Sequence, residues 1–369
     1  MPFRIQSSKR VIGLLSASVS LAFLAGLGFD MLRIPLAWVL GPLIATAALS
    51  LSGLPVFRSN VARRAGQIAI GGGLGLHVTA ALLTEMLAWV PFMIVLSLVA
   101  ISVTSFFSVF LGRFSGLDRV TSYFALLPGG LSEMANIGAK VGATSEPIAL
   151  SQAIRVAFVV CVLPPAIVAL GIHGTFEAYD GAVEAVSYRT LPLLFAASLI
   201  GVWVMSLIGA NNPWMLGAIV TAALLSSNEL VVGAMPRPVF YGGQLLLGMA
   251  IGARFRQEIV MRLPRLSLMM TLFTLFVTVS LFGLGMIVAL LSALDPATAA
   301  LATSAGGVAE MALTAQFLNL NVALILAFHV IRAIVVNGVS VTLFNLFTRT
   351  GFFGAVERLE AFLFGARRR

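Results

Sequence analysis

Charged residues and cysteine are scarce in this sequence. Only 10% of its 369 residues are Asp, Glu, Lys or Arg, against about 25% in a typical soluble domain. The single cysteine, Cys161, excludes an internal disulfide, and its apolar neighbours indicate an inert buried thiol. The three histidines, His77, His173 and His329, are far apart in the sequence, so there is no close-spaced pair of metal ligands. These shortages exclude an ordinary soluble domain and argue against a metal-dependent enzyme.

Several sequence signatures of function are also missing. The glycine-rich segment 71–75 is not followed by Gly-Lys-Ser/Thr, so it is not a nucleotide-binding P-loop. Strand-like alternation is not sustained anywhere, which argues against a membrane β-barrel. No loop between the apolar runs is long enough to hold a DNA-binding domain. The net charge of +9 is therefore expected to reflect orientation in a membrane rather than binding to nucleic acid.

Apolar runs are what the sequence has in abundance. Hydrophobic residues make up 59% of the chain, and the mean hydropathy is +1.04. Runs of about 20 apolar residues, the length that a bilayer-spanning helix requires, recur throughout. We expect an all-α polytopic membrane protein with about 10–12 membrane segments. The apolar runs lie at 11–29, 35–53, 65–84, 87–111, 120–142, 147–171, 188–208, 213–232, 242–262, 265–292, 297–318 and 321–348.

The sequence repeats itself at an offset of 177 residues. Gly-Gly-Leu-Ser-Glu-Met-Ala at 129–135 returns at 306–312 as Gly-Gly-Val-Ala-Glu-Met-Ala, and Ile154-Arg155 returns as Ile331-Arg332. The chain is therefore a tandem duplication. Its predicted parts are a first membrane repeat at 1–171, an acidic connector at 172–187, a second membrane repeat at 188–348 and a cytoplasmic tail at 349–369.

Loop charges predict that the two repeats face opposite sides of the membrane. Residues 1–10 are basic, whereas their repeat partner, the connector, is acidic. Segment 254–265 is strongly basic, whereas its partner 77–88 is not. Because positive loops stay in the cytoplasm, we expect an inverted repeat with both termini cytoplasmic. In the tail, Phe353, Val356, Leu359 and Leu363 share one helical face, which favours an amphipathic helix on the cytoplasmic membrane surface; a frayed tail is the alternative.

An inverted repeat needs an odd number of crossings in each copy, so one of the six segments should be re-entrant or interrupted. The first choice is 120–142, because Pro128-Gly129-Gly130 breaks its helix midway. The second choice is the glycine-rich segment 71–75, although its glycines are interpreted first as close helix packing. Inverted repeats with interrupted helices are the architecture of many secondary transporters.

Ionisable residues inside the apolar runs are the first candidates for function, because charge is costly in lipid. A helix that restarts after Gly129-Gly130 or Gly306-Gly307 presents free N–H groups and its positive dipole end to an anion. Three residues later, Glu133 and Glu310 can bind a proton or Na⁺. Arg155 and Arg332 can grip a carboxylate in bidentate fashion. The alternative is that each Glu–Arg set is a structural salt bridge between helices.

Gln152 and His329 occupy equivalent positions, three residues before each arginine. They should face the same side of the helix as the arginines. His329 is predicted either to shuttle protons or, more simply, to hydrogen-bond a neighbouring helix. The candidate substrate- and ion-binding residues are Gly129, Gly130, Ser132, Glu133, Gln152, Arg155, Gly306, Gly307, Glu310, His329 and Arg332.

The duplicated Gly-Gly-x-x-Glu-Met-Ala motif, followed by the Gln-x-x-Arg element at 152–155, resembles the membrane AbrB family. The resemblance covers nearly the whole chain and is most specific at 127–134. The second copy departs from the motif, with Ala305 in place of proline, Ala309 in place of serine and His329 in place of glutamine. This implies a weaker or differently tuned second half-site.

Labels attached to the family imply regulation of gene expression or ammonia oxidation. Nothing in this sequence resembles a DNA reader, and ammonia oxidation needs a clustered metal site that the sequence lacks. We regard neither label as the molecular activity.

The leading hypothesis is a bacterial inner-membrane secondary transporter of a small, anionic organic solute, working by alternating access. It would need no cofactor beyond H⁺ or Na⁺ as coupling ion, and its partners would be the lipid bilayer and a small-molecule substrate, with no nucleic acid. The alternative is a membrane-embedded regulator that binds a ligand and affects gene expression indirectly. A membrane enzyme is less favoured. The sequence indicates neither the solute nor the oligomeric state.

Overall fold

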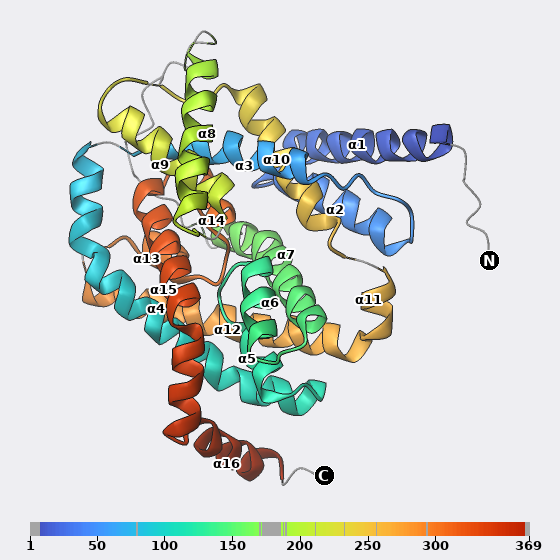
Figure 1. The fold of residues 1–369 in the computed structure, drawn as a ribbon, viewed down its shortest axis with the longest axis vertical. Helices are drawn as coiled ribbons and strands as arrows, with labels where there is room; N and C mark the ends of the chain where they lie inside the picture. Colours follow the sequence, from blue (N-terminus) through green and yellow to red (C-terminus); the bar gives the residue numbers. More distant parts are fainter. Residues whose placement is uncertain are drawn as a thin grey trace. The chain divides into compact units, whose positions relative to one another are not determined.

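A computed structural model describes residues 8–365, except 79, 170, 172–185, 187, 189, 211, 232, 256 and 293. The described part is built of helices, α1 to α16, as the composition predicts (Figure 1). The acidic connector predicted at 172–187 lies almost entirely outside the described residues.

The helices cluster into two compact units, and each unit takes helices from both halves of the chain. Residues 1–79 and 178–262 form the first unit, and residues 80–177 and 263–369 form the second. The first unit contains α1 Ser8–Met31, α2 Ala37–Leu51, α3 Asn60–Gly75, α8 Leu191–Leu207, α9 Pro213–Ser227, α10 Arg237–Gly252 and α11 Gln257–Arg262. The second unit contains α4 Ala80–Ser115, α5 Arg119–Leu126, α6 Leu131–Lys140, α7 Ser145–Ala169, α12 Pro264–Leu291, α13 Pro296–Thr303, α14 Val308–Phe317, α15 Val322–Arg349 and α16 Phe352–Phe364.

Five helices of the described chain are long and apolar enough to cross a membrane. The spans in α4, α7, α12 and α15 belong to the second unit, and the span at Gly13–Met31 belongs to the first. Several further apolar helices, such as α2, α8 and α9, have only 15–17 residues, fewer than the about 20 of a full crossing. The protein is thus a multi-pass membrane protein, as predicted, although fewer helices reach full spanning length than the apolar runs suggest.

Some predicted apolar runs do not match single helices. The run at 65–84 contains the end of α3 and the start of α4, which are separated at Leu76–Val78. The run at 242–262 likewise joins α10 to α11, although α10 ends at Gly252. Hydropathy did not reveal the break at Leu76–Val78, because an apolar residue scores the same inside a helix and between helices. The break after α10 does contain the charged residue Arg254, but the apolar residues on both sides place it within one run.

Glycines bring helices of the first unit into close contact. A Cβ on Gly71 of α3 would lie 2.8 Å from the carbonyl oxygen of Met215 on α9. In α10, a Cβ on Gly248 would overlap the carbonyl oxygen of Val39 on α2. Helix α3 also packs on α10. The packing interpretation of these glycines is confirmed, since small residues let the backbones approach.

The last helix, α16, packs on α4 and α15 within the second unit, beyond the end of α15 in Figure 1. Phe353 and Val356 of the predicted apolar face are buried, whereas Leu359 and Leu363 are exposed. Two ion pairs join α16 to the α4–α5 region. Arg113 contacts Glu360 at 2.8 Å, and Arg119 contacts Glu357 at 2.5 Å. Part of the face predicted to lie on the membrane therefore packs against protein.

Candidate functional site

Two helix interruptions define the candidate site, and both lie in the second unit. Helix α5 ends at Leu126, and α6 begins at Leu131 after the segment Leu127–Gly130. Helix α13 ends at Thr303, and α14 begins at Val308 after Ser304–Gly307. The N-cap residues of α6 and α14 are glycines in extended conformation. The break predicted at Pro128-Gly129-Gly130 is therefore present, and the chain is also broken 177 residues later, at a segment without a proline.

Arg155 of α7 holds the first interruption. The side chain is buried, and its Nη1 and Nη2 atoms donate to the carbonyl oxygens of Leu127 and Gly129 at 2.5 and 2.7 Å. These carbonyls follow the C-terminal end of α5, where no intrahelical donor is left for them. The guanidinium thus satisfies carbonyls that the break leaves without helical partners, and it places positive charge at the negative end of the α5 dipole.

Arg332 of α15 holds the second interruption in the same way. Its Nη1 donates to the carbonyl oxygen of Ser304, and its Nη2 donates to that of Gly306 at 2.5 Å. Ser304 and Gly306 lie 177 positions after Leu127 and Gly129, the offset at which the sequence motif recurs. The Nε atoms of both arginines are buried without a hydrogen-bond partner among the residues that the structure describes.

Gln152 and His329 reinforce the arginines from one turn earlier. Gln152 Nε2 donates to the carbonyl oxygens of Phe124, Ala125 and Leu127 at 3.0–3.1 Å. His329 Nε2 lies 2.9 Å from the carbonyl oxygen of Leu301, and its Nδ1 lies 2.7 Å from Arg332 Nη2. Because a guanidinium can only donate, Nδ1 is the acceptor and Nε2 carries the hydrogen that Leu301 accepts. This tautomer matches the donor that Gln152 supplies in the first half.

Glu133 and Glu310 lie over the start of the restarted helices. Each is the third residue after its N-cap glycine, the position from which a glutamate folds back in a capping box. A Cβ on Gly130 would overlap Oε2 of Glu133, and a Cβ on Gly307 would overlap Oε2 of Glu310. Glycine is therefore the residue that leaves room for each carboxylate. Glu310 is buried, whereas Glu133 is partly exposed.

The two interruptions meet inside the second unit. Helix α6 contacts α15, and α14 contacts α7, so each restarted helix lies against the helix that carries the arginine of the other interruption. Arg155 interacts electrostatically with Glu310 from the second repeat and with Arg332. Charged side chains of the two interruptions therefore lie near one another within the second unit.

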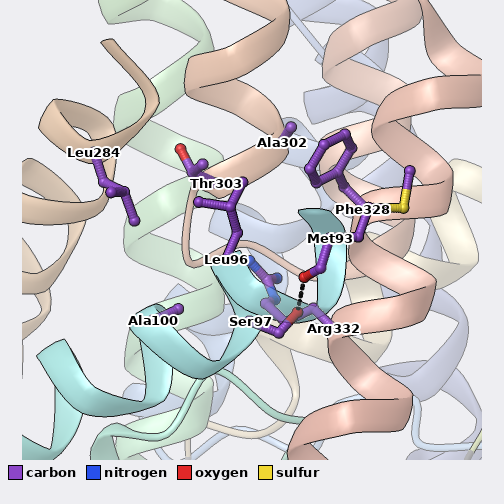
Figure 2. Close-up of a pocket in the computed structure, with 9 residues that line it drawn as sticks. All are labelled: Met93, Leu96, Ser97, Ala100, Leu284, Ala302, Thr303, Phe328 and Arg332. Carbon is purple, nitrogen blue, oxygen red and sulfur yellow. Dashed lines mark hydrogen bonds between the residues drawn. The ribbon is translucent and has the colours of Figure 1, made fainter. Parts of the chain in front are cut away.

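A small cavity adjoins this cluster at Arg332. It has a volume of about 10 Å³, enough for about one water molecule. Residues from α4, α12, α13 and α15 line it, as Figure 2 shows. Ser97 lies on its wall and donates to the carbonyl oxygen of Met93 at 2.7 Å. Most of the lining side chains are apolar, and the cavity has no room for a solute of several heavy atoms at this point in this conformation.

The structure brings most of the sequence-predicted residues together. The glycine pairs, both glutamates, both arginines, Gln152 and His329 all lie at the interruptions; the side chain of Ser132 falls outside the described part. Sequence reasoning missed the acceptors of the arginines, which are main-chain carbonyls. It also missed two methionines that pack on the interruptions. The side chain of Met134 lies against Gly129, and that of Met311 lies against Gly306, so closely that a Cβ on either glycine would overlap the methionine. The repeated Glu-Met pair was the signal that could have indicated the methionines.

Comparison with known proteins places this sequence in a family. Residues 58–348, well over half of the chain, match the family model described as transition state regulatory protein AbrB. This chain belongs to the AbrB family. It is 25% identical over 345 residues to a Bacillus subtilis (strain 168) protein named YhjN, covering 86% of this chain and 89% of that protein. It is 27% identical over 319 residues to an Escherichia coli (strain K12) protein described as a candidate regulator, AbrB, covering 85% and 90%. Both relatives of this AbrB-family protein are bacterial.

Proposed function

We propose that this AbrB-family protein is an ion-coupled secondary transporter of a small organic anion in the bacterial cytoplasmic membrane. The observation that carries the proposal is the pair of interrupted helices, each held by a buried arginine and each restarted beneath a glutamate. Half-helix ends that meet inside a membrane protein are the ion- and substrate-binding device of many secondary transporters.

The lengths of the half-helices support this proposal. Helices α5 and α6 have 8 and 10 residues, so at 1.5 Å per residue they reach about 12 and 15 Å. The hydrocarbon core is about 30 Å thick, and each half-helix therefore covers about half of it. In this arrangement the interruption lies near the middle of the membrane, with the two repeats in inverted orientation and both termini cytoplasmic.

Each residue of the cluster has a role in this mechanism. The N-termini of α6 and α14, with the positive ends of their helix dipoles, attract the anionic solute. Glu133 and Glu310 take up the coupling ion, H⁺ or Na⁺, at the same helix ends. Arg155 and Arg332 stabilise the helix interruptions by donating hydrogen bonds to their main-chain carbonyls. They therefore position the site and do not bind the solute directly. Alternating access would open the cluster to one side of the membrane at a time, and no covalent chemistry is required.

A flux assay tests the coupling role of the glutamates. Full-length protein in proteoliposomes would be given an inward H⁺ or Na⁺ gradient, with labelled succinate and glutamate as probes. We expect gradient-driven uptake of at least one probe, loss of this uptake in Glu133→Gln or Glu310→Gln, and retention in Glu146→Gln. Glu146 is the matched control because it is an exposed carboxylate at the start of α7. Full gradient dependence in both site variants would remove the glutamates from the mechanism.

Cysteine accessibility tests the inverted topology. Single cysteines at Asp180 and Gln257, on a Cys161→Ala background, would be labelled from each side of the membrane with an impermeant reagent. The proposal expects labelling at position 180 from outside and at position 257 from the cytoplasm. Cytoplasmic labelling at both positions would make the repeats parallel and would contradict the transport mechanism.

A ligand-binding regulator is the second candidate, favoured by the description of the Escherichia coli relative as a candidate regulator. It would use the same cluster and would bind a probe without moving it. Binding of a probe to the purified protein, with no flux in either gradient, would support the regulator and reject the transporter.

A further inference from the structure

A larger cavity lies in the first unit, between the loop that precedes α3 and the C-terminal end of α10. Its volume is about 230 Å³, somewhat below the about 300–1,000 Å³ of sites for drug-sized ligands. The lining residues are Phe57, Arg58, Ser59, Asn60, Ala62, Arg63, Leu246, Met249, Ala250, Ala253 and Arg254. The cavity is large enough for a compact polar group.

Positive charge dominates this cavity. Three of the lining residues are arginines, Arg58, Arg63 and Arg254, and none of the lining residues is a carboxylate. The N-terminus of α3 also opens into it through Ser59 and Asn60. Ser59 accepts from the N–H of Ala62, and the first turn of α3 contains no acidic residue. The positive end of the helix dipole therefore adds to the field of the three guanidinium groups.

The walls of the cavity are fixed by contacts of their own. Phe57 packs on the cluster of Ala22, Leu245 and Met249, and its N–H donates to Ser18 Oγ at 3.1 Å. Arg58 donates from Nη2 to Ser50 Oγ at 3.1 Å. Arg63 Nη1 lies 3.3 Å from Gln67 Oε1. Arg58 and Arg63 are thus held near the cavity before any ligand arrives, which lowers the ordering cost of binding.

We propose that this cavity binds a phosphate-bearing anion, and that the headgroup of an acidic phospholipid is its source. Arginine and helix N-termini are the groups that best match phosphate oxygens. Two apolar residues close in sequence to the lining residues have exposed side chains, Val61 (74% exposed) and Leu54 (48% exposed). These side chains are available to contact the acyl chains of the lipid. Basic clusters beside membrane segments attract acidic lipids. The site is separate from the helix interruptions and does not depend on the proposed transport function.

Binding measurements on the detergent-solubilised full-length protein test this site. Short-chain phosphatidylglycerol, short-chain phosphatidylcholine and inorganic phosphate would be titrated separately. We expect phosphatidylglycerol to bind, and the double variant Arg58→Gln/Arg63→Gln to weaken this binding on the order of tenfold to thirtyfold. Arg237→Gln is the control for loss of an arginine away from the cavity, because Arg237 is exposed at the opposite end of α10 from Arg254. It should bind phosphatidylglycerol as the wild type does.

Asn60→Asp separates binding from folding. Asn60 is the first residue of α3, where a carboxylate stabilises a helix, yet the same carboxylate would repel an anion in the cavity. We expect unchanged or higher thermal stability together with loss of phosphatidylglycerol binding. Inorganic phosphate binding with the same variant dependence, without a preference for the lipid, would overturn the lipid source. Equal phosphatidylglycerol binding by wild type, Asn60→Asp and the double variant would overturn the site itself.

Discussion

Arg155 of α7 donates a hydrogen bond of 2.7 Å from Nη2 to the carbonyl oxygen of Gly129, in the segment where the preceding helix is interrupted. A second bond from Nη1 reaches the carbonyl oxygen of Leu127. Arg332 repeats both bonds in the second half of the chain. Each arginine therefore stabilises one helix interruption, Arg155 the one between α5 and α6 and Arg332 the one between α13 and α14.

Arg155→Lys should destabilise the protein although it keeps the charge. A lysine ammonium cannot hold the two carbonyls in the forked geometry of guanidinium. Losing one charge-assisted bond to a buried carbonyl costs about 1.5–3 kcal/mol. Thermal unfolding in detergent should show a clear decrease for Arg155→Lys and for Arg332→Lys. Wild-type stability in both variants would contradict the positioning role.

His329→Gln should be tolerated better than His329→Ala. A glutamine can donate to the carbonyl oxygen of Leu301, as Gln152 does to Phe124 in the first half. An alanine removes one hydrogen bond from that carbonyl and one from Arg332 Nη2, which keeps its bond to Gly306. The loss of buried hydrogen bonds of this kind costs about 1–3 kcal/mol. The measurement is the unfolding temperature of the two variants side by side. Equal losses in glutamine and alanine variants would show that the donor is not what matters at this position.

Gly130→Ala and Gly307→Ala should impair gradient-driven uptake more than they impair stability. The added Cβ would overlap a glutamate Oε2, and this flexible side chain can move away at little cost. The carboxylate then leaves the start of the restarted helix. Gly338→Ala is the matched control, because a Cβ there meets nothing within 4 Å. The idea fails if uptake by both site variants equals that of the control.

Glu360→Gln should destabilise the C-terminal helix, whereas Glu357→Gln should not. The Arg113–Glu360 pair is nearly buried, with side chains 15% and 3% exposed. The Arg119–Glu357 pair is 43% and 41% exposed, and pairs of that kind contribute about 0–1 kcal/mol. Limited proteolysis of α16 provides the measurement, with faster cleavage expected only in Glu360→Gln. Equal cleavage rates in the two variants would contradict this difference.

Much of the fold could be predicted from the sequence alone. Apolar runs and the shortage of charge determine a multi-pass helical membrane protein, because the bilayer requires helices of this length and composition. The break at Pro128-Gly129-Gly130 is also visible, since proline and glycine destabilise a helix wherever it lies. The offset of 177 residues indicated which glutamates and arginines to examine together.

Other features were decided only by the tertiary structure. Each compact unit contains helices from both halves of the chain. The recurrence of a motif along the sequence does not reveal which helices of one half pack against which helices of the other. Arg155 and Arg332 donate to main-chain carbonyls, whereas the sequence suggested a solute carboxylate or a glutamate as the acceptor. Every residue has a carbonyl, so no side-chain pattern distinguishes the ones that accept. The sequence alone determined which charged residues have a high free-energy cost of burial in the membrane. Only the packing of α7 on α5 and of α15 on α13 decided that hydrogen bonds to main-chain carbonyls offset this cost.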